Sequence, residues 1–402
     1  MSRRILHLLS QRPGRTGSGV TLDSLVRFSA KAGWEQAAAL GTPAEDPQPD
    51  LGDVDRESVH PLIFESGDLD FPVPGMSDVM PYPSTRFSDM DADALARYRH
   101  AWRELLKEVI GSFRPDLIHS HHLWLLSSMV KDLAPDLPLL IQCHATGLRQ
   151  LELCPLLAGE VLAGCARADR FQVLSSAHAI RLSDCLGVGL DRIHVIPSGY
   201  REDLFHRRGR SGDWSERILY VGKLSRAKGL PWLLDAFERL RDERSSIQLH
   251  VAGSGGGAEA ENLERRMTGM AGAVFHGMLG QEALGALMRR SEICVLPSFY
   301  EGVPLVLVEA LACGCKLLST DLPGVRDRIA PAAGPALRTL PLPGLKNVDE
   351  PREEDLPAFV ENLARGLALA LDAPAPEAAE LDEFGWRAVF RRTETIWKEL
   401  LS

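Results

Sequence analysis

The segment Ser298–Gly314, SFYEGVPLVLVEALACG, carries two carboxylates at a spacing that suits the binding of hydroxyl groups. Glu301 precedes a turn at Gly302, and Pro304 is expected in the first turn of the following helix, where its missing N–H is no loss. Glu309 then lies about five residues into that helix, about 7 Å along its axis. Taken alone, such a pair could be a capping glutamate and an exposed helix glutamate.

The same helix start is suited to an anion. The free backbone amides of Val303 and Leu305 are expected to point outward, and Gly302 lets a ligand approach the backbone closely. A helix N-terminus that follows a strand is a binding site for phosphate. With a carboxylate on either side, the segment predicts a phosphate site flanked by a sugar and a ribose.

A second segment, ILYVGKLSRAKGLPWLLDAFERL (218–240), supplies positive charge. Lys223 and Lys228 bracket a loop between a strand and a helix that begins near Leu230. At the carboxyl edge of a parallel sheet, two such lysines can reach a diphosphate as point charges. Solvated surface lysines are the alternative.

Glycine-rich turns follow two further strands. In RTGSGVTL (15–22), Gly17, Ser18 and Gly19 lead into an amphipathic helix and would let a ligand approach its N-terminus. The segment VAGSGGG (251–257) lacks a full G-x-G-x-x-G, so a tight turn and a binding loop are equally supported.

Histidines stand at the expected carboxyl ends of two strands. His144 ends LLIQCH (139–144), and His119, His121 and His122 follow the preceding strand. Parallel sheets bind ligands at this edge, although a buried, hydrogen-bonded histidine is the alternative interpretation. We expect contacts with substrate here and no metal site.

Short apolar runs alternate with amphipathic stretches along the whole chain, which is typical of parallel βαβ units. We therefore expect an α/β protein of two doubly wound domains, covering residues 1–205 and 212–380 and joined by the polar stretch 206–214. Two Pro-rich stretches, 43–90 and 331–357, are expected to be irregular. Residues 381–402 are expected to form a helix with an apolar face. The expected strands cover residues 5–9, 117–119, 139–143, 171–174, 194–196, 218–221, 249–252, 274–276, 293–296 and 316–319.

Composition excludes several classes of protein. The 402 residues are 45% hydrophobic and 25% charged, with a net charge of −10 and no long block of one sign. This balance argues against nucleic-acid binding, which needs clustered Lys and Arg. The seven cysteines form no C-x-x-C pair, and no run is long enough for a secretory signal or a membrane span. We expect a cytoplasmic protein whose contact with membranes, if any, is peripheral.

Taken together, these motifs resemble retaining glycosyltransferases of family 4, which have the GT-B fold. EGVPLVLVEALACG is similar to the family's E-x7-E motif, VGKLSRAKG to its V-G-R-L-x-x-x-K-G motif, and IPSGYREDLF to its I-P-N-G-V-D-x-x-x-F motif. The resemblance covers essentially the whole chain. It implies two Rossmann-like domains facing across a cleft, an acceptor domain followed by a nucleotide-sugar donor domain, and a C-terminal helix that crosses back to the first.

The resemblance also implies roles for single residues. Glu301 and His144 would be catalytic, with Glu301 stabilising charge at the transferred sugar. His121 and His122 would contact the acceptor. Lys223 stands where an arginine is usual, and Ser198 and Tyr200 replace Asn and Val. The residues expected to bind the donor are Gly17, Ser18, Gly19, Lys223, Lys228, Gly302, Val303, Pro304, Leu305 and Glu309.

The implied function is transfer of a sugar from a nucleotide-sugar to an acceptor with retention of configuration. UDP is the commonest donor nucleotide of the family, and no residue selects it over GDP or ADP. No cofactor or essential metal is expected, and the acceptor could be a saccharide, a lipid or a small metabolite. A sugar-nucleotide epimerase of the same fold and a non-catalytic nucleotide-sugar sensor are the alternatives.

Overall fold

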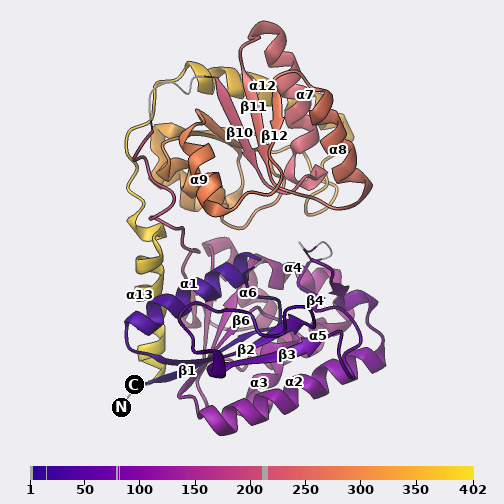
Figure 1. Ribbon diagram of the computed structural model, residues 1–402, viewed down its shortest axis with the longest axis vertical. Helices are drawn as coiled ribbons and strands as arrows, with labels where there is room; N and C mark the ends of the chain where they lie inside the picture. The colour runs from indigo at the N-terminus through magenta and orange to yellow at the C-terminus, as the bar shows by residue number, and fades with distance from the viewer. Residues whose placement is uncertain (1–2, 15, 78–79, 81, 211–215) are drawn as a thin grey trace. The chain divides into compact units, whose positions relative to one another are not determined.

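The computed structural model describes residues 3–14, 16–77, 80, 82–210 and 216–402 (Figure 1). The chain forms two compact units. Unit 1 comprises residues 1–198 together with 386–402, and unit 2 comprises residues 199–385. Each is a parallel sheet covered by helices, so the two Rossmann-like α/β domains expected from the sequence are confirmed.

Unit 1 contains a seven-stranded sheet in the order β3-β2-β1-β6-β7-β8-β9, with every neighbouring pair parallel. The order reverses between β1 and β6, and open α/β sheets bind ligands at the carboxyl ends of the strands at such a switch point. The strands are β1 (Arg4–Leu9), β2 (Glu35–Pro43), β3 (Val59–Phe64), β6 (Leu117–His121), β7 (Leu139–Cys143), β8 (Arg170–Val173) and β9 (Ile193–Val195). The helices are α1 (Gly17–Lys31), α2 (Ala92–Phe113), α3 (Leu125–Leu133), α4 (Ala145–Leu153), α5 (Pro155–Cys165) and α6 (Ser176–Leu186).

Unit 2 contains a six-stranded parallel sheet in the order β12-β11-β10-β13-β14-β15, with its switch point between β10 and β13. The strands are β10 (Arg217–Val221), β11 (Gln248–Ala252), β12 (Ala273–Phe275), β13 (Ile293–Leu296), β14 (Lys316–Thr320) and β15 (Leu337–Leu340). The main helices are α7 (Leu230–Glu243), α8 (Gly257–Gly269), α9 (Gln281–Arg289), α10 (Leu305–Ala312) and α12 (Leu356–Asp372).

The last helix, α13 (Trp386–Leu400), belongs to unit 1. Its apolar face, which includes Val389, Phe390 and Trp397, packs with Ile5 of β1 and Leu117 of β6 in one buried cluster. The expected return of the C-terminal helix to the first domain is therefore confirmed.

The expected irregular stretches contain strands. Residues 43–90 include β3, which forms one edge of the unit 1 sheet, and the short parallel pair β4 (Pro74–Gly75) and β5 (Thr85–Arg86). Pro61 in β3 hides the strand signal, because proline is tolerated at a sheet edge and not in a central strand. Residues 331–357 likewise include β15 at one edge of the other sheet.

The unit boundaries also differ from the expected 205 and 381. The Tyr200 amide donates to the Phe384 carbonyl at 2.9 Å, and Phe205 is buried in the same cluster as Tyr200 and Phe384. Residues 199–205 and 381–385 therefore belong to unit 2 and contribute to its core. The expected linker covers residues 206–214. Arg210 in this stretch donates to the Cys313 carbonyl of unit 2. Residues 211–214 lie outside the described part of the chain.

Candidate active site

The switch point of unit 2 brings two of the expected site residues into contact. Lys228 Nζ lies 2.7 Å from a carboxylate oxygen of Glu301 and 3.3 Å from the carbonyl of Tyr300. The Lys228 and Glu301 side chains are 24% and 18% exposed. The pair is thus partly shielded from water and still open to a ligand.

Close packing of two loops produces this contact. Gly229 has a φ of 72°, and a Cβ at this position would lie 2.1 Å from the Pro297 carbonyl oxygen. Beside it, the Phe299 amide donates to the Ala227 carbonyl at 3.0 Å. Only glycine allows the loop before α7 to approach the loop after β13 so closely.

Lys223 follows β10 on the same edge of the sheet. Its side chain is exposed, and its backbone carbonyl accepts a hydrogen bond of 2.7 Å from the Tyr220 hydroxyl. In the VAGSGGG segment, Gly253 has a φ of 146°, and a Cβ there would lie 1.9 Å from the Gly222 carbonyl oxygen. The first glycine of that segment is therefore explained by packing beside the Lys223 loop.

Helix α10 begins at Leu305, and Pro304 is its N-cap in extended geometry. The expectation that Pro304 lies in the first turn is thus wrong by one position, because its ψ of 96° is not helical. Gly302 and Val303 precede the cap, so their amides and those of the first helical residues lie together at the helix start. These amides have no intrahelical partners and remain available to an anion.

Glu309 lies in α10 with its side chain partly buried. Burial raises the pKa of this carboxyl group to about 7. No hydrogen bond or ion pair to its carboxylate is found within the described residues. A desolvated carboxylate without a partner is the kind of group that ligand hydroxyls can satisfy.

In unit 1, Gly17, Ser18 and Gly19 form the first turn of α1. The Thr16 hydroxyl caps this turn by accepting from the Gly19 amide at 3.2 Å. A Cβ at Gly19 would lie 2.6 Å from the Gly14 amide nitrogen. Gly19 is therefore required by the loop that covers it, whereas a Cβ at Gly17 would meet nothing within 4 Å.

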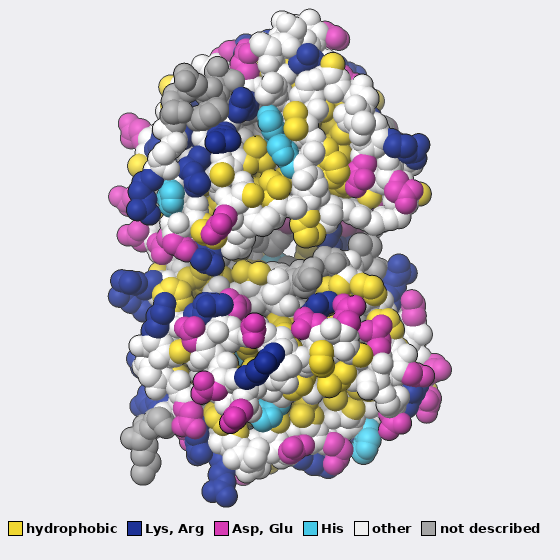
Figure 2. Space-filling model, viewed as in Figure 1, with side chains coloured by type: hydrophobic (Ala, Val, Ile, Leu, Met, Phe, Trp, Pro, Cys, Tyr) yellow, Lys and Arg dark blue, Asp and Glu magenta, His cyan; other side chains and the backbone are white. Residues whose placement is uncertain are grey.

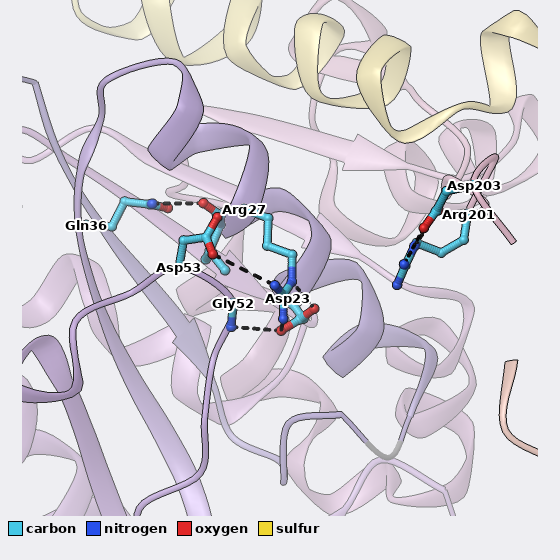
Figure 3. A network of polar contacts seen from close by, with 8 residues as sticks. Asp23, Arg27, Gln36, Gly52, Asp53, Arg201 and Asp203 are labelled. Atoms are coloured by element: carbon cyan, nitrogen blue, oxygen red, sulfur yellow. Dashed lines mark hydrogen bonds and ion pairs between the residues drawn. The ribbon is translucent and has the colours of Figure 1, made fainter. Parts of the chain in front are cut away.

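A polar network fixes α1 against the segment that follows β2 (Figure 3). Asp23 accepts hydrogen bonds from the Gly52 amide at 2.8 Å and from Arg27 at 2.9 Å. Arg27 also lies 3.8 Å from Asp53. These contacts hold the helix whose first turn carries the glycines.

His122 and His144 meet at the carboxyl edge of the unit 1 sheet. Their ring centroids lie 5.0 Å apart, and the buried Nε2 atom of each has no partner within the described residues. Burial lowers the pKa of His144 to about 4, so its ring is neutral at pH 7. His122 has a φ of 92°, a backbone conformation that is uncommon for residues other than glycine and that clusters at functional sites.

His121 lies deeper in the sheet than that pair and stacks on His144 at a centroid distance of 6.2 Å. It is 1% exposed and stacks on His119 at 4.5 Å, beside His7 of β1. His7 was missed by the sequence analysis, although a lone polar residue in the apolar run ILHLL was a usable signal.

Comparison with known proteins agrees with the fold and with the expected family. Residues 16–204 match the model described as Glycosyltransferase Family 4, and residues 215–337 match the model described as Glycosyl transferases group 1. Each of the two units therefore matches a glycosyltransferase domain model. The chain belongs to glycosyltransferase family 4.

Among curated relatives, glycogen synthase of Mycobacterium tuberculosis is 30% identical over 54% of this chain and 55% of its own. The D-inositol 3-phosphate glycosyltransferase of Paenarthrobacter aurescens is 29% identical over 58% of each chain. The chain thus spans about half the length of the curated relatives it matches.

Solved structures match over nearly the whole chain. A UDP-forming α,α-trehalose-phosphate synthase from Burkholderia vietnamiensis gives a TM-score of 0.70 at 16% identity, covering 100% of this chain and 99% of that one. This likeness confirms the fold. Among the described residues, no helix is both long and apolar enough to cross a membrane.

Proposed function

We propose that this protein transfers a sugar from a nucleoside diphosphate-sugar to a sugar acceptor, with retention of the anomeric configuration. The observation that carries the proposal is the Lys228–Glu301 contact at the unit 2 switch point, beside the start of α10. One structural relative is described as UDP-forming, which supports UDP as the donor nucleotide.

Breaking the bond from sugar C1 to the diphosphate leaves negative charge on the phosphate oxygens. Lys223 and Lys228 would neutralise this charge, together with the amides of Gly302, Val303 and Leu305. The two lysines and these amides would neutralise the diphosphate, which is the role of a metal ion in metal-dependent enzymes. The proposal therefore needs no metal at the phosphates.

The transferred sugar carries positive charge in an oxocarbenium-like transition state. The Glu301 carboxylate would stabilise that charge. The Nε2 atom of His144 has no partner within the described residues and would form a hydrogen bond with a hydroxyl group of the transferred sugar. Because the His144 ring is neutral, it would not add a positive charge next to the positively charged sugar.

Glu309 would hold the ribose hydroxyls of the donor. The burial that raises the pKa of its carboxyl group supports this role, because two hydroxyl donors would compensate its lost hydration. In unit 1, the turn Gly17–Gly19 would contact the donor, and His122 would contact the acceptor. All seven cysteines are unpaired and six are buried, which supports a cytoplasmic location for the reaction.

The deciding experiment measures release of free nucleotide from UDP-, GDP- and ADP-sugars, with and without a panel of sugar acceptors. Transfer requires acceptor-dependent release together with a new glycoside whose anomeric configuration, read by NMR, matches that of the donor. Release without acceptor would favour an epimerase or hydrolase. Binding without turnover of any donor would favour a sensor.

A further inference from the structure

A row of polar side chains lies buried between the unit 1 sheet and α13. His7 of β1 and His119 of β6 are register partners and are 0% exposed, and His121 is 1% exposed. The ring of Trp397 from α13 lies 5.9 Å from the His7 ring and 5.7 Å from the His119 ring. Burying polar rings in a core is costly unless each nitrogen finds a partner.

Most of these nitrogens have none within the described part of the chain. His7 Nδ1 and both ring nitrogens of His119 and His121 are buried without a hydrogen-bond partner. One nitrogen from each ring can be chosen such that all three atoms lie within 4.8 Å of one another. Three neighbouring imidazole nitrogens form a ligand set that occurs in zinc sites.

A neighbouring amide sets the tautomer of His7. Gln36 donates its Nε2 hydrogen to the Val26 carbonyl at 2.9 Å, a contact drawn in Figure 3. Its Oε1 atom, 3.2 Å from His7 Nε2, must then accept, so the His7 proton lies on Nε2. The lone pair of Nδ1 is thereby left free, which is how an outer hydrogen bond commonly orients a metal-binding histidine.

A further buried polar side chain lies on the strand next to His121. Gln142 of β7 is the register partner of His121, and neither its Oε1 nor its Nε2 atom has a partner within the described residues. The amide oxygen, or a water molecule held by it, would supply a fourth ligand.

We propose that His7, His119 and His121 bind a divalent transition metal, zinc by ligand type, in a structural site beneath α13. The ion would satisfy the orphaned nitrogens and tie the two strands of the switch point together. Its ligands differ from the unit 2 lysines and amides that would bind the diphosphate, and His121 would connect the metal to His144, on which its ring stacks at 6.2 Å. It also reassigns His121 from the acceptor to the metal.

Metal content of the purified full chain tests this directly. All proteins carry Cys185→Ser, because Cys185 is the exposed thiol and could bind zinc at the surface. After incubation with excess Zn²⁺ and removal of loosely held metal, mass spectrometry should find a single zinc ion per chain. The His119→Gln variant should lose it. The matched control His250→Gln alters a stacked histidine pair of unit 2, His250–His276, and should retain the zinc.

Two measurements on the protein with all three histidines test the proposal even if the His119→Gln variant folds poorly. Co²⁺ bound to the unaltered rings should give the intense visible absorption of a four-coordinate site. Zinc at about 100 times its Kd should raise the Tm of unit 1 by about 5–10 °C. Zinc retention equal in His119→Gln and its parent, or no zinc and no Co²⁺ spectrum in the parent, would overturn the proposal and leave a layer hydrated by buried water.

Discussion

Lys228 and Glu301 are joined by an ion pair of 2.7 Å. The carboxylate that would face the sugar is thus anchored by the cation that would face the diphosphate. A donor phosphate must share Lys228 with Glu301, so the two halves of the proposed chemistry are linked through one ammonium group.

Lys228→Ala is expected to weaken binding of the donor and of free nucleoside diphosphate alike, each by about tenfold or more, because a charge-assisted phosphate contact is lost. Isothermal titration calorimetry with UDP and UDP-sugar measures both. Lys107→Ala, which removes an exposed lysine paired with Glu104 in unit 1, is the control. An unchanged UDP affinity would remove Lys228 from the phosphate site.

Glu301→Gln keeps the size of the side chain and removes the charge that faces the developing positive sugar. We expect kcat to fall more than about tenfold, at least about 1.4 kcal/mol, with little change in donor Kd. Turnover at saturating donor and calorimetry separate the two effects. If only affinity falls, Glu301 is a ground-state binding residue.

Glu309→Gln is expected to show the opposite profile, because a ribose contact exists before and during the reaction. In the unaltered protein, donor affinity should rise from pH 6 to pH 8 as a carboxyl group with a pKa of about 7 ionises and becomes a pure acceptor. The variant should lose this pH dependence. The same pH dependence in both proteins would assign it to another group.

Glu309→Gln should also stabilise the ligand-free fold at high pH. The folded-state pKa of Glu309 is raised from 4.5 to about 7, so the folded state is penalised as pH rises through that interval and fully penalised above it. Chemical unfolding should show a gain of about 1–3 kcal/mol at pH 8 and almost none at pH 4. Equal gains at both values would point to packing instead of ionisation.

Binding of UDP is expected to be the same in EDTA and in Mg²⁺, because lysines and backbone amides would neutralise the diphosphate in the proposed site. Calorimetry in the two buffers, on the same preparation, tests this. Binding lost in EDTA and restored by Mg²⁺ would place a metal at the phosphates.

Residues 293–312 show how far sequence reasoning reaches. A buried strand, a glycine turn and a helix follow one another over a few residues, so β13 and the start of α10 were predictable to within one position. The same locality made β10, Lys223 and the start of α7 at Leu230 predictable.

Features that depend on distant residues were not predictable. The ion pair of Lys228 depends on how Gly229 fits against Pro297, and the grouping of His7 with His119 depends on the register of β1 and β6. The alanine-rich strand β2 resembles a helix in its residue preferences, and only its neighbours in the sheet make it a strand.

Helix α13 has a consequence for the order of events during synthesis. The ribosome makes residues 199–385, the whole of unit 2, before it makes the helix whose Trp397 covers His7 and His119. The nascent first unit therefore leaves its histidine layer uncapped while the second unit is free to fold. The large core cluster of unit 1 contains no α13 residue and can form early, whereas the cluster beneath α13 can be completed only after all of unit 2 has been made.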